Sequence, residues 1–381
     1  MKVFLHRAVP CRCTDSRESA TRKIWTAAVA LLLTTGGSPA ASAQTYIAID
    51  LHPSGFASSE ARGVADGQQV GAGVGPTTSG QRHALLWTGA ANSVVDLHPS
   101  GYASSEARGI ADGQQVGLGN SGSPLFFTSA FLWSGTAESV VKLGDGFAFA
   151  NAIRDGQQVG ATGDNVQHAL LWTGSAQSVV DLHPRGYFLS QTWGVADGQQ
   201  VGLGTWPESG REIHALLWWG TADSFVDLHP SGFESSVALG LADGQQVGYG
   251  GVPGGGRHAL LWSGTAASVV DLHPTGYVVS EGHGIANGQQ VGYGASPGAP
   301  VHGLLWSGTA ASVLDLHQFL PEGYNESLAL GIDSEGNIVG SARGPATGGN
   351  YHAILWRAMP CAMGPPKRLS LAACQPAEGR R

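Results

Sequence analysis

The feature that most constrains the fold of this chain is a phrase that recurs seven times. One copy, residues 258–294, reads HALLWSGTAASVVDLHPTGYVVSEGHGIANGQQVGYG, and each copy carries HALLW, DLHP and GQQVG, or close relatives, in the same order. The copies follow one another at intervals of about 44 residues, a period that indicates a solenoid, a β-propeller or another repeat array. The fold is therefore expected to consist of seven equivalent units.

Each unit divides into four short strands, named A to D here. Strand A is of the ARGIAD type and ends at an Asp-Gly or Asn-Gly pair, which favours a tight hairpin turn. Strand B (QQVGYG) precedes a variable loop rich in Gly and Pro. Strand C (HALLW) precedes an SGTAAS turn, and strand D (SVVDL) precedes the loop into the next unit. Four such strands are typical of one antiparallel propeller blade.

The two ends of the repeat region predict a closed ring. Residues 45–53 (TYIAIDLHP) have the sequence of a strand D with no other strand before it, and the last unit stops after strand C at residues 352–356. In an open solenoid both ends would be bare edges that need caps. We therefore predict an all-β fold over residues 44–357. It is a seven-bladed β-propeller of four-stranded antiparallel blades, closed by the N-terminal strand pairing with the last blade.

Side-chain size agrees with this arrangement. Strand A alternates small residues such as Ala107, Gly109 and Ala111, which fit the crowded axis of a propeller. Strand C ends in a tryptophan in every unit, and a bulky apolar side chain repeated in each blade is expected to fill the core between neighbouring blades. These structural tryptophans are Trp87, Trp133, Trp172, Trp218, Trp262, Trp306 and Trp356.

Residues 1–43 have the pattern of a secretory signal peptide. Arg22 and Lys23 precede a short apolar run at residues 24–33, and a small-residue A-x-A site ends at Ala43, where we expect cleavage. The apolar run is too short to span a membrane. Cleavage would leave 14 basic and 26 acidic residues, and this negative charge disfavours nucleic acid as a partner. We expect an exported monomer, extracellular or periplasmic, with no membrane span.

The C-terminal tail, residues 358–381, holds the two cysteines that remain after this cleavage, Cys361 and Cys374. Exported proteins meet an oxidising environment, so a disulfide that staples the tail is the expected role of these residues if they pair.

The repeats resemble a known family. HALLW, DLHP and the final unit's ALGIDSEGNIVGSARG are similar to the HAF repeat of presumed extracellular bacterial proteins, over about residues 45–357. The middle units depart from the family by using ADGQQVG where it tends to have an Asn-rich turn. The resemblance implies export and a β-propeller-like array, and it implies no activity.

Most histidines belong to two repeated positions, the first residue of HALLW and the third of DLHP. Both positions adjoin the D–A and B–C loops, which share one end of a propeller, called the loop face here. His258 and His273 are expected to be approximate cross-strand neighbours. Each ring either braces the blade by bonding a loop carbonyl or the nearby Asp, or serves as a metal ligand. Repetition in the blades and only two visible ligands favour bracing, so we predict no metal and no cofactor.

Aromatic residues outside the repeat pattern are the candidate ligand contacts. They are Tyr187, Phe188, Trp193 and Trp206, which lie in or beside loops of the loop face; Trp219 is expected on the opposite face. Exposed aromatic platforms stack on sugar rings or anchor protein partners. Ordinary loop packing is the alternative.

These observations favour a secreted, non-enzymatic binding or scaffold propeller that engages a glycan or protein ligand through its loop face. The alternative is an extracellular glycan-active enzyme, a hydrolase or lyase, with its site at the central channel. An enzyme should place a unique cluster of Asp, Glu, Arg or Tyr at the channel mouth. Most acidic residues occupy repeated positions, and no catalytic motif is present, so no catalytic residue is assigned.

Overall fold

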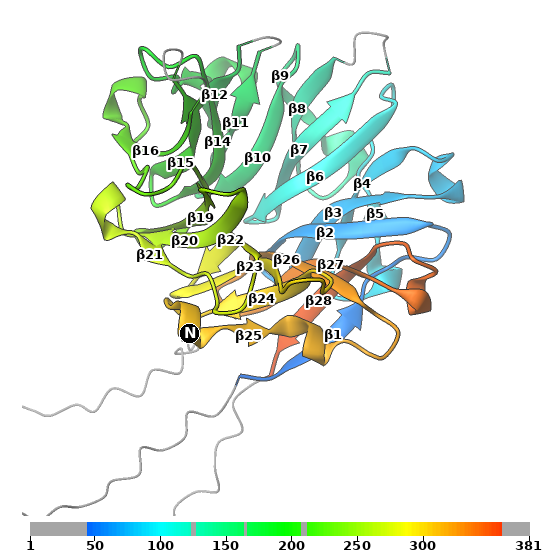
Figure 1. The fold of residues 1–381 in the computed structure, drawn as a ribbon. Helices are drawn as coiled ribbons and strands as arrows, with labels where there is room; N and C mark the ends of the chain where they lie inside the picture. The colour runs from blue at the N-terminus through cyan, green and yellow to red at the C-terminus, as the bar shows by residue number, and fades with distance from the viewer. Residues whose placement is uncertain (1–43, 123–126, 164–165, 207–211, 360–381) are drawn as a thin grey trace, which may run out of the picture. The chain divides into compact units, whose positions relative to one another are not determined.

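The computed structural model describes residues 44–122, 127–163, 166–206 and 212–359. In these residues, seven four-stranded antiparallel sheets follow one another around a ring (Figure 1). The proposed signal peptide and both tail cysteines, Cys361 and Cys374, lie outside the described residues. Within the described ranges, no helix is long and apolar enough to cross a membrane.

The first four blades each take their strands in chain order. Their strands are β2 (Ser58–Ala65), β3 (Gln68–Val74), β4 (Arg82–Trp87) and β5 (Val95–Asp96); β6 (Ser104–Ala111), β7 (Gln114–Asn120), β8 (Thr128–Trp133) and β9 (Val141–Gly144); β10 (Phe149–Arg154), β11 (Gln157–Thr162), β12 (His168–Trp172) and β13 (Val180–Asp181); and β14 (Leu189–Ala196), β15 (Gln199–Thr205), β16 (Ile213–Trp218) and β17 (Val226–Asp227).

The last three blades complete the ring. Their strands are β18 (Ser235–Ala242), β19 (Gln245–Val252), β20 (Gly256–Trp262) and β21 (Val270–Asp271); β22 (Val279–Ala286), β23 (Gln289–Ala295), β24 (His302–Trp306) and β25 (Leu314–Asp315); and β26 (Glu326–Ile332), β27 (Ile338–Arg343), β28 (His352–Ala358) and β1 (Tyr46–Asp50).

Short 3-10 turns occupy the connections. Those between strands C and D are η2 (Ala91–Ser93), η3 (Ala137–Ser139), η4 (Ala176–Ser178), η5 (Ala222–Ser224), η6 (Ala266–Ser268) and η7 (Ala310–Ser312). The B–C loops hold η1 (Pro76–Thr78) and η9 (Pro345–Thr347), and a D–A loop holds η8 (Leu316–Phe319).

The predicted seven-bladed architecture and its closure are confirmed. β1 pairs antiparallel with β28, from Tyr46 opposite Ala358 to Asp50 opposite Ile354. The inner strand β26 of this last blade also contacts β2 of the first. Chain ends separated by some 300 residues therefore share one sheet (Figure 1), which leaves neither β28 nor the N-terminal strand as an unpaired edge.

The repeated tryptophans lie in the core between blades. All seven are at most 1% exposed. Trp262 and Leu260 of one blade pack with Leu217 and Leu228 of the preceding blade, and the other blade pairs repeat this pattern. Burying a large aromatic side chain in each blade joint makes these joints the main hydrophobic core of the protein.

Two structural requirements explain why the GQQVG motif recurs, one for its second glutamine and one for its last glycine. Its second glutamine is buried and joins the two turns at the end of the blade opposite the loop face: in the first blade, Gln69 Nε2 donates to the Gly67 carbonyl and Gln69 Oε1 accepts from the Gly89 amide. Its last glycine lies against the neighbouring strand A. A Cβ on Gly248 would stand 1.9 Å from the Val237 carbonyl oxygen, so no larger residue fits there.

Candidate functional site

Each innermost strand contains a β-bulge, which leaves one of its residues without a partner on the adjacent strand. In β2, for example, the register shifts between Ala61 and Gly63, so that Arg62 has no partner on β3. Bulges re-aim side chains and are over-represented beside active sites. The bulged residues of the seven inner strands are Arg62, Arg108, Asn151, Trp193, Leu239, His283 and Leu330.

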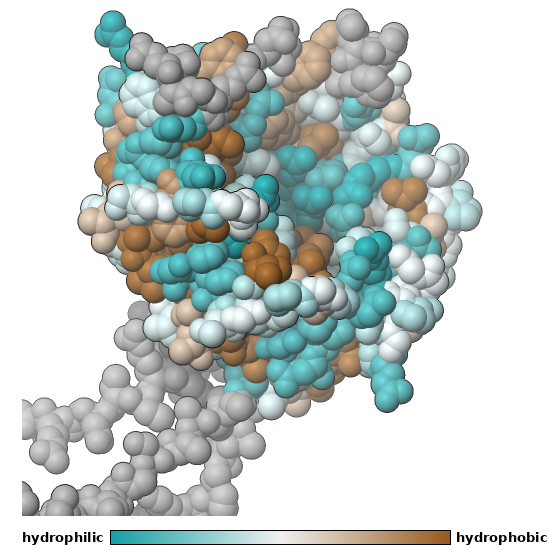
Figure 2. Space-filling model, viewed as in Figure 1, coloured by the Kyte–Doolittle hydropathy of each residue, from teal (hydrophilic) through white to brown (hydrophobic). Residues whose placement is uncertain are grey.

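All seven bulged residues line one cavity at the centre of the ring. Its volume is about 320 Å³, within the range of small-molecule sites. The remaining lining residues come from positions on strands A and B nearer the loop face: Leu203, Val237, Tyr249 and Glu281. The cavity therefore occupies the part of the channel toward the loop face. Figure 2 shows the hollow at the centre of the ring, bordered by both hydrophilic and hydrophobic groups.

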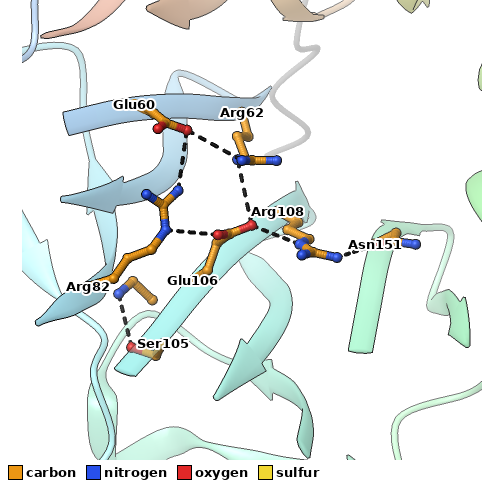
Figure 3. A network of polar contacts seen from close by, with 8 residues as sticks. Glu60, Arg62, Arg82, Ser105, Glu106, Arg108 and Asn151 are labelled. Atoms are coloured by element: carbon orange, nitrogen blue, oxygen red, sulfur yellow. Dashed lines mark hydrogen bonds and ion pairs between the residues drawn. The ribbon is translucent and has the colours of Figure 1, made fainter. Parts of the chain in front are cut away.

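An arginine–glutamate network forms the wall of the cavity on the first two blades (Figure 3). Glu106 accepts from Arg82 Nε and from Arg108 Nε, both at 2.8 Å, and lies 3.6 Å from Arg62 Nε. Glu60 accepts from Arg82 at 3.2 Å and from Arg62 at 3.3 Å. Burial acts to raise the pKa of Glu106, but the three guanidinium groups outweigh it and lower the pKa to about 2.

The network continues into the third blade. Arg108 Nη1 donates to Asn151 Oδ1 at 2.7 Å, and Asn151 Nδ2 donates to the Thr192 carbonyl at 2.8 Å. Arg108 is thus held between a carboxylate and an amide, and its planar group is fixed in orientation. The first three blades together present a positively charged wall to the cavity, in which Arg108 has a fixed orientation.

A second cluster lies on the sixth blade, around the buried carboxylate of Glu281. Arg257 donates to Glu281 Oε1 at 2.7 Å, the Tyr293 hydroxyl donates to Oε2 at 2.8 Å, and His283 Nε2 lies 3.5 Å from Oε2. Burial acts to raise the pKa of Glu281, but these three neighbours together lower it to about 2. Burial and the nearby Glu281 raise the pKa of Tyr293, which keeps this hydroxyl protonated.

The rest of the wall is largely apolar, and it contains unpaired donors. Leu239 and Leu330 face the cavity beside the indole of Trp193. Twelve buried side-chain polar atoms of the described residues have no hydrogen-bond partner, and five of them are indole nitrogens of the repeated core tryptophans. Three others belong to residues that line the cavity: Arg62 Nε, Trp193 Nε1 and His283 Nε2. Buried polar atoms in native proteins are almost always paired. The cavity is the candidate functional site because the seven bulged residues line it and because two ion-pair clusters, around Glu106 and Glu281, adjoin it.

This cluster was missed in the sequence. Glu60, Glu106 and Glu281 share one repeated position, two residues before the bulged residue, but the arginines that pair with them differ between blades. The signal was present in strand A. The position between two fixed small residues reads R, R, N, W, L, H and L in successive units, so symmetry breaks at one defined point of each blade.

The repeated histidines form stacked pairs on the loop face. His83 and His98 lie 3.9 Å apart with nearly parallel rings, and His258 and His273 lie 3.8 Å apart. His83 Nδ1 donates to Asp96 at 2.7 Å. His98 Nε2 lies 3.1 Å from the Tyr102 carbonyl, which only accepts, so His98 Nδ1 accepts from the Ser105 hydroxyl at 2.8 Å.

These groups act as one structural unit. Ser105 Oγ in turn accepts from the Ala84 amide of the preceding blade. The aspartate bonds one histidine and the serine bonds the other, so the set is not a catalytic triad. The joint between the second and third blades lacks this unit: Ser129 and Gly144 stand at the two histidine positions, and Ala148 stands at the serine position. There, Ser129 and Lys142 bond Asp145 instead. Loss of all three together indicates bracing. No group of three potential metal ligands occurs in the described ranges.

The histidine pairs predict that the protein loses stability in acid. Burial, followed by the charge of the stacked partner, lowers the pKa of His52, His98, His183, His229, His273 and His317. At pH values below the histidine pKa of the unfolded chain, about 6.5, the unfolded chain binds more protons than the folded one. The free energy of unfolding therefore decreases as the pH is lowered. Glu106 and Glu281, with pKa values of about 2, stay ionised throughout this range.

Scanning calorimetry from pH 8 to pH 5 should show a plateau of Tm above pH 7 and a steady fall below about pH 6.5. A His273→Gln variant should have a shallower fall than the wild type, because one of the six sites no longer titrates. A Tm that is constant over the whole range would contradict the bracing role.

The aromatic candidates from the sequence do not form one surface. Trp193 lies in β14 and lines the cavity. Trp206 is 37% exposed and packs on Tyr187, with ring centroids 4.6 Å apart, while Tyr187 is buried in the joint between blades. Phe188 is partly buried beside the end of β15, where its amide donates to the Thr205 carbonyl. Of these four, only Trp193 is brought to the channel.

No protein-family model matches this chain, and no curated protein sequence is detectably similar to it. Among solved structures, the chain is similar to the β-propeller domain of the trilobed protease from Pyrococcus furiosus, which has an open velcro topology. The two are 9% identical with a TM-score of 0.56, and the match covers 82% of this chain and 95% of that domain. It is also similar to a puromycin hydrolase, with 12% identity, a TM-score of 0.53, and coverage of 83% of this chain and 57% of the hydrolase. This chain therefore spans little more than half of that enzyme. Likeness at such low identity establishes the propeller fold alone.

Proposed function

We propose that this protein is an exported, non-enzymatic binding protein whose ligand, a glycan, enters the central channel from the loop face. The observation that carries the proposal is the departure from symmetry in the channel. The seven bulged residues are of five different types, whereas the residues that flank them are small in every blade. Structural demands are the same in every blade, so they do not account for this variety, whereas an asymmetric ligand does.

The chemistry of the cavity suits a sugar. Trp193 and two leucines supply apolar surface, and the polar side chains of Asn151 and His283 line the same cavity. Aromatic surface next to scattered hydrogen-bond donors matches the two faces and the rim of a sugar ring. The volume of about 320 Å³ is near the lower end of small-molecule sites, which suits one sugar residue.

A glycan hydrolase or lyase at the same channel is the second candidate, because a unique cluster of charged groups does occupy it. The state of its carboxyl groups favours binding instead. A general acid needs a carboxyl with a raised pKa, whereas the pKa values of Glu106 and Glu281 are both lowered to about 2. Both are also bound to arginines, which leaves them poorly placed to transfer protons.

A glycan array probed with the full chain tests the proposal. The Trp193→Ala variant should bind the retained glycans about 30-fold more weakly, the loss expected when a buried aromatic anchor is removed. The matched control Trp206→Ala removes an exposed loop tryptophan and should bind like the wild type. The reverse result would place the ligand on the loops, and no binding to any glycan would reject the proposal. Release of shorter sugars from a bound glycan would favour the enzyme.

A further inference from the structure

The ion-pair network at the cavity wall contains more positive than negative side chains. The network on the first two blades holds three guanidinium groups, from Arg62, Arg82 and Arg108, and two carboxylates, from Glu60 and Glu106. One positive charge is therefore left over, in a concave site where solvent screening is weaker than at an open surface. Across the cavity, Arg257 balances Glu281.

The surplus charge lies on the cavity side of the network. Arg62 and Arg108 line the cavity, whereas Glu60, Glu106 and Arg82 are not among its lining residues. Arg108 is held in place by Glu106 and Asn151. Arg62 is held more loosely: it makes one hydrogen bond, of 3.3 Å to Glu60, and its Nε lies 3.6 Å from Glu106. Of the two guanidinium groups that line the cavity, that of Arg108 is therefore fixed, and that of Arg62 makes fewer hydrogen bonds.

We propose that this wall binds a carboxylate, and that the glycan residue held in the channel is a uronic acid. This inference rests on the proposed function above. Arg62 and Arg108 would donate to the two carboxylate oxygens, an arrangement for which guanidinium groups are suited. On the sixth blade, Arg257 is already paired with Glu281 and offers no surplus positive charge to a carboxylate, so the sugar has one preferred orientation. Its carboxylate faces the first two blades, and its hydroxyls face Asn151 and His283.

Isothermal titration calorimetry with the full chain tests this assignment. The probes are disaccharides of galacturonate, glucuronate and mannuronate, together with their neutral methyl esters, which have the same rings without the charge. At least one uronate should bind about 10- to 100-fold more tightly than its ester, the contribution expected of a charge-assisted pair. This preference should shrink as salt is added, because ions screen the attraction.

Variants distinguish carboxylate recognition from a general effect on the fold. Arg62→Gln should weaken uronate binding by much more than it weakens ester binding, and Arg62→Lys should restore part of this difference. Arg82→Gln is the matched control: it takes a charge from the same network at a position that does not line the cavity, so it should reduce the preference less than Arg62→Gln. Ester binding also reports whether each variant is folded.

The outcomes separate the two proposals. If esters and neutral glycans bind in a Trp193-dependent manner as tightly as the uronates, the carboxylate assignment is wrong and the glycan-binding function stands. If neither uronates nor neutral glycans bind, both proposals fail. If Arg62→Gln weakens ester and uronate binding equally, Arg62 supports the cavity without recognising a charge, and the assignment is overturned.

Discussion

Deletion of residues 44–51 should lower the Tm of the protein by more than about 10 °C and convert it from a closed ring into an aggregation-prone chain. This segment supplies β1 to the last blade and the buried side chains of Tyr46 and Leu51. Two buried side chains of this size are worth about 2–3 kcal/mol each, and the Asp50–His352 bond is lost with them. β28 would then present a bare edge to other molecules.

Complementation with a peptide isolates the role of β1 in this result. A synthetic peptide with the sequence of residues 44–53 should restore the Tm and the monomeric mass of the deletion protein, measured by calorimetry and light scattering. A peptide of the same composition in scrambled order should do neither, because it cannot place Tyr46 and Leu51 in the core. A deletion protein that stays monomeric, with its Tm within about 2 °C of the wild type, would show that the ring does not depend on this strand.

Gly248→Ala should destabilise the protein by about 3 kcal/mol or more, at the upper end of what overpacking costs, or prevent soluble expression. The added Cβ would stand 1.9 Å from the Val237 carbonyl oxygen and 3.0 Å from the Ala238 Cα. Backbone atoms cannot move aside like the end of a flexible side chain, so β18 and β19 would have to separate. Urea unfolding of the purified variant measures the effect.

Gly303→Ala provides the matched control for this substitution. Gly303 stands where the other six units have alanine in HALLW or its relatives, and a Cβ there would be 3.3 Å or more from its nearest neighbours. We expect a change within about 0.5 kcal/mol, as for substitutions that meet no special feature. Equal effects of the two alanines would refute the explanation given for the last glycine of GQQVG.

The repeat made the fold predictable because its signals are local. The number of blades, the order of strands and the ring closure all follow from short motifs and from the incomplete units at the two ends, and the structure has each of them. The expected neighbours His258 and His273 are stacked, since pairing of adjacent strands C and D fixes their positions.

The candidate site was not predictable in the same way. Trp193 was expected to border a D–A loop on the same face as Trp206, but it lies within β14 and lines the channel. Arg62, Arg108 and His283 could not be predicted as site residues, because the sequence does not show which partner a single polar residue inside a strand will have. Alternation along a strand gives the face of a side chain only while the register is regular, and each of these residues sits at a bulge.

The sequence by itself determined the seven blades, the closing strand and the glycines and tryptophans that hold them, because these depend on turns and pairings between near neighbours along the chain. Only the tertiary structure decided what the channel contains. Glu106 meets Arg62 of the blade before it, and Arg108 meets Asn151 of the blade after it. Such contacts come into being when seven separate strands converge on one axis, and the direction of each side chain there is set by a local shift in strand register.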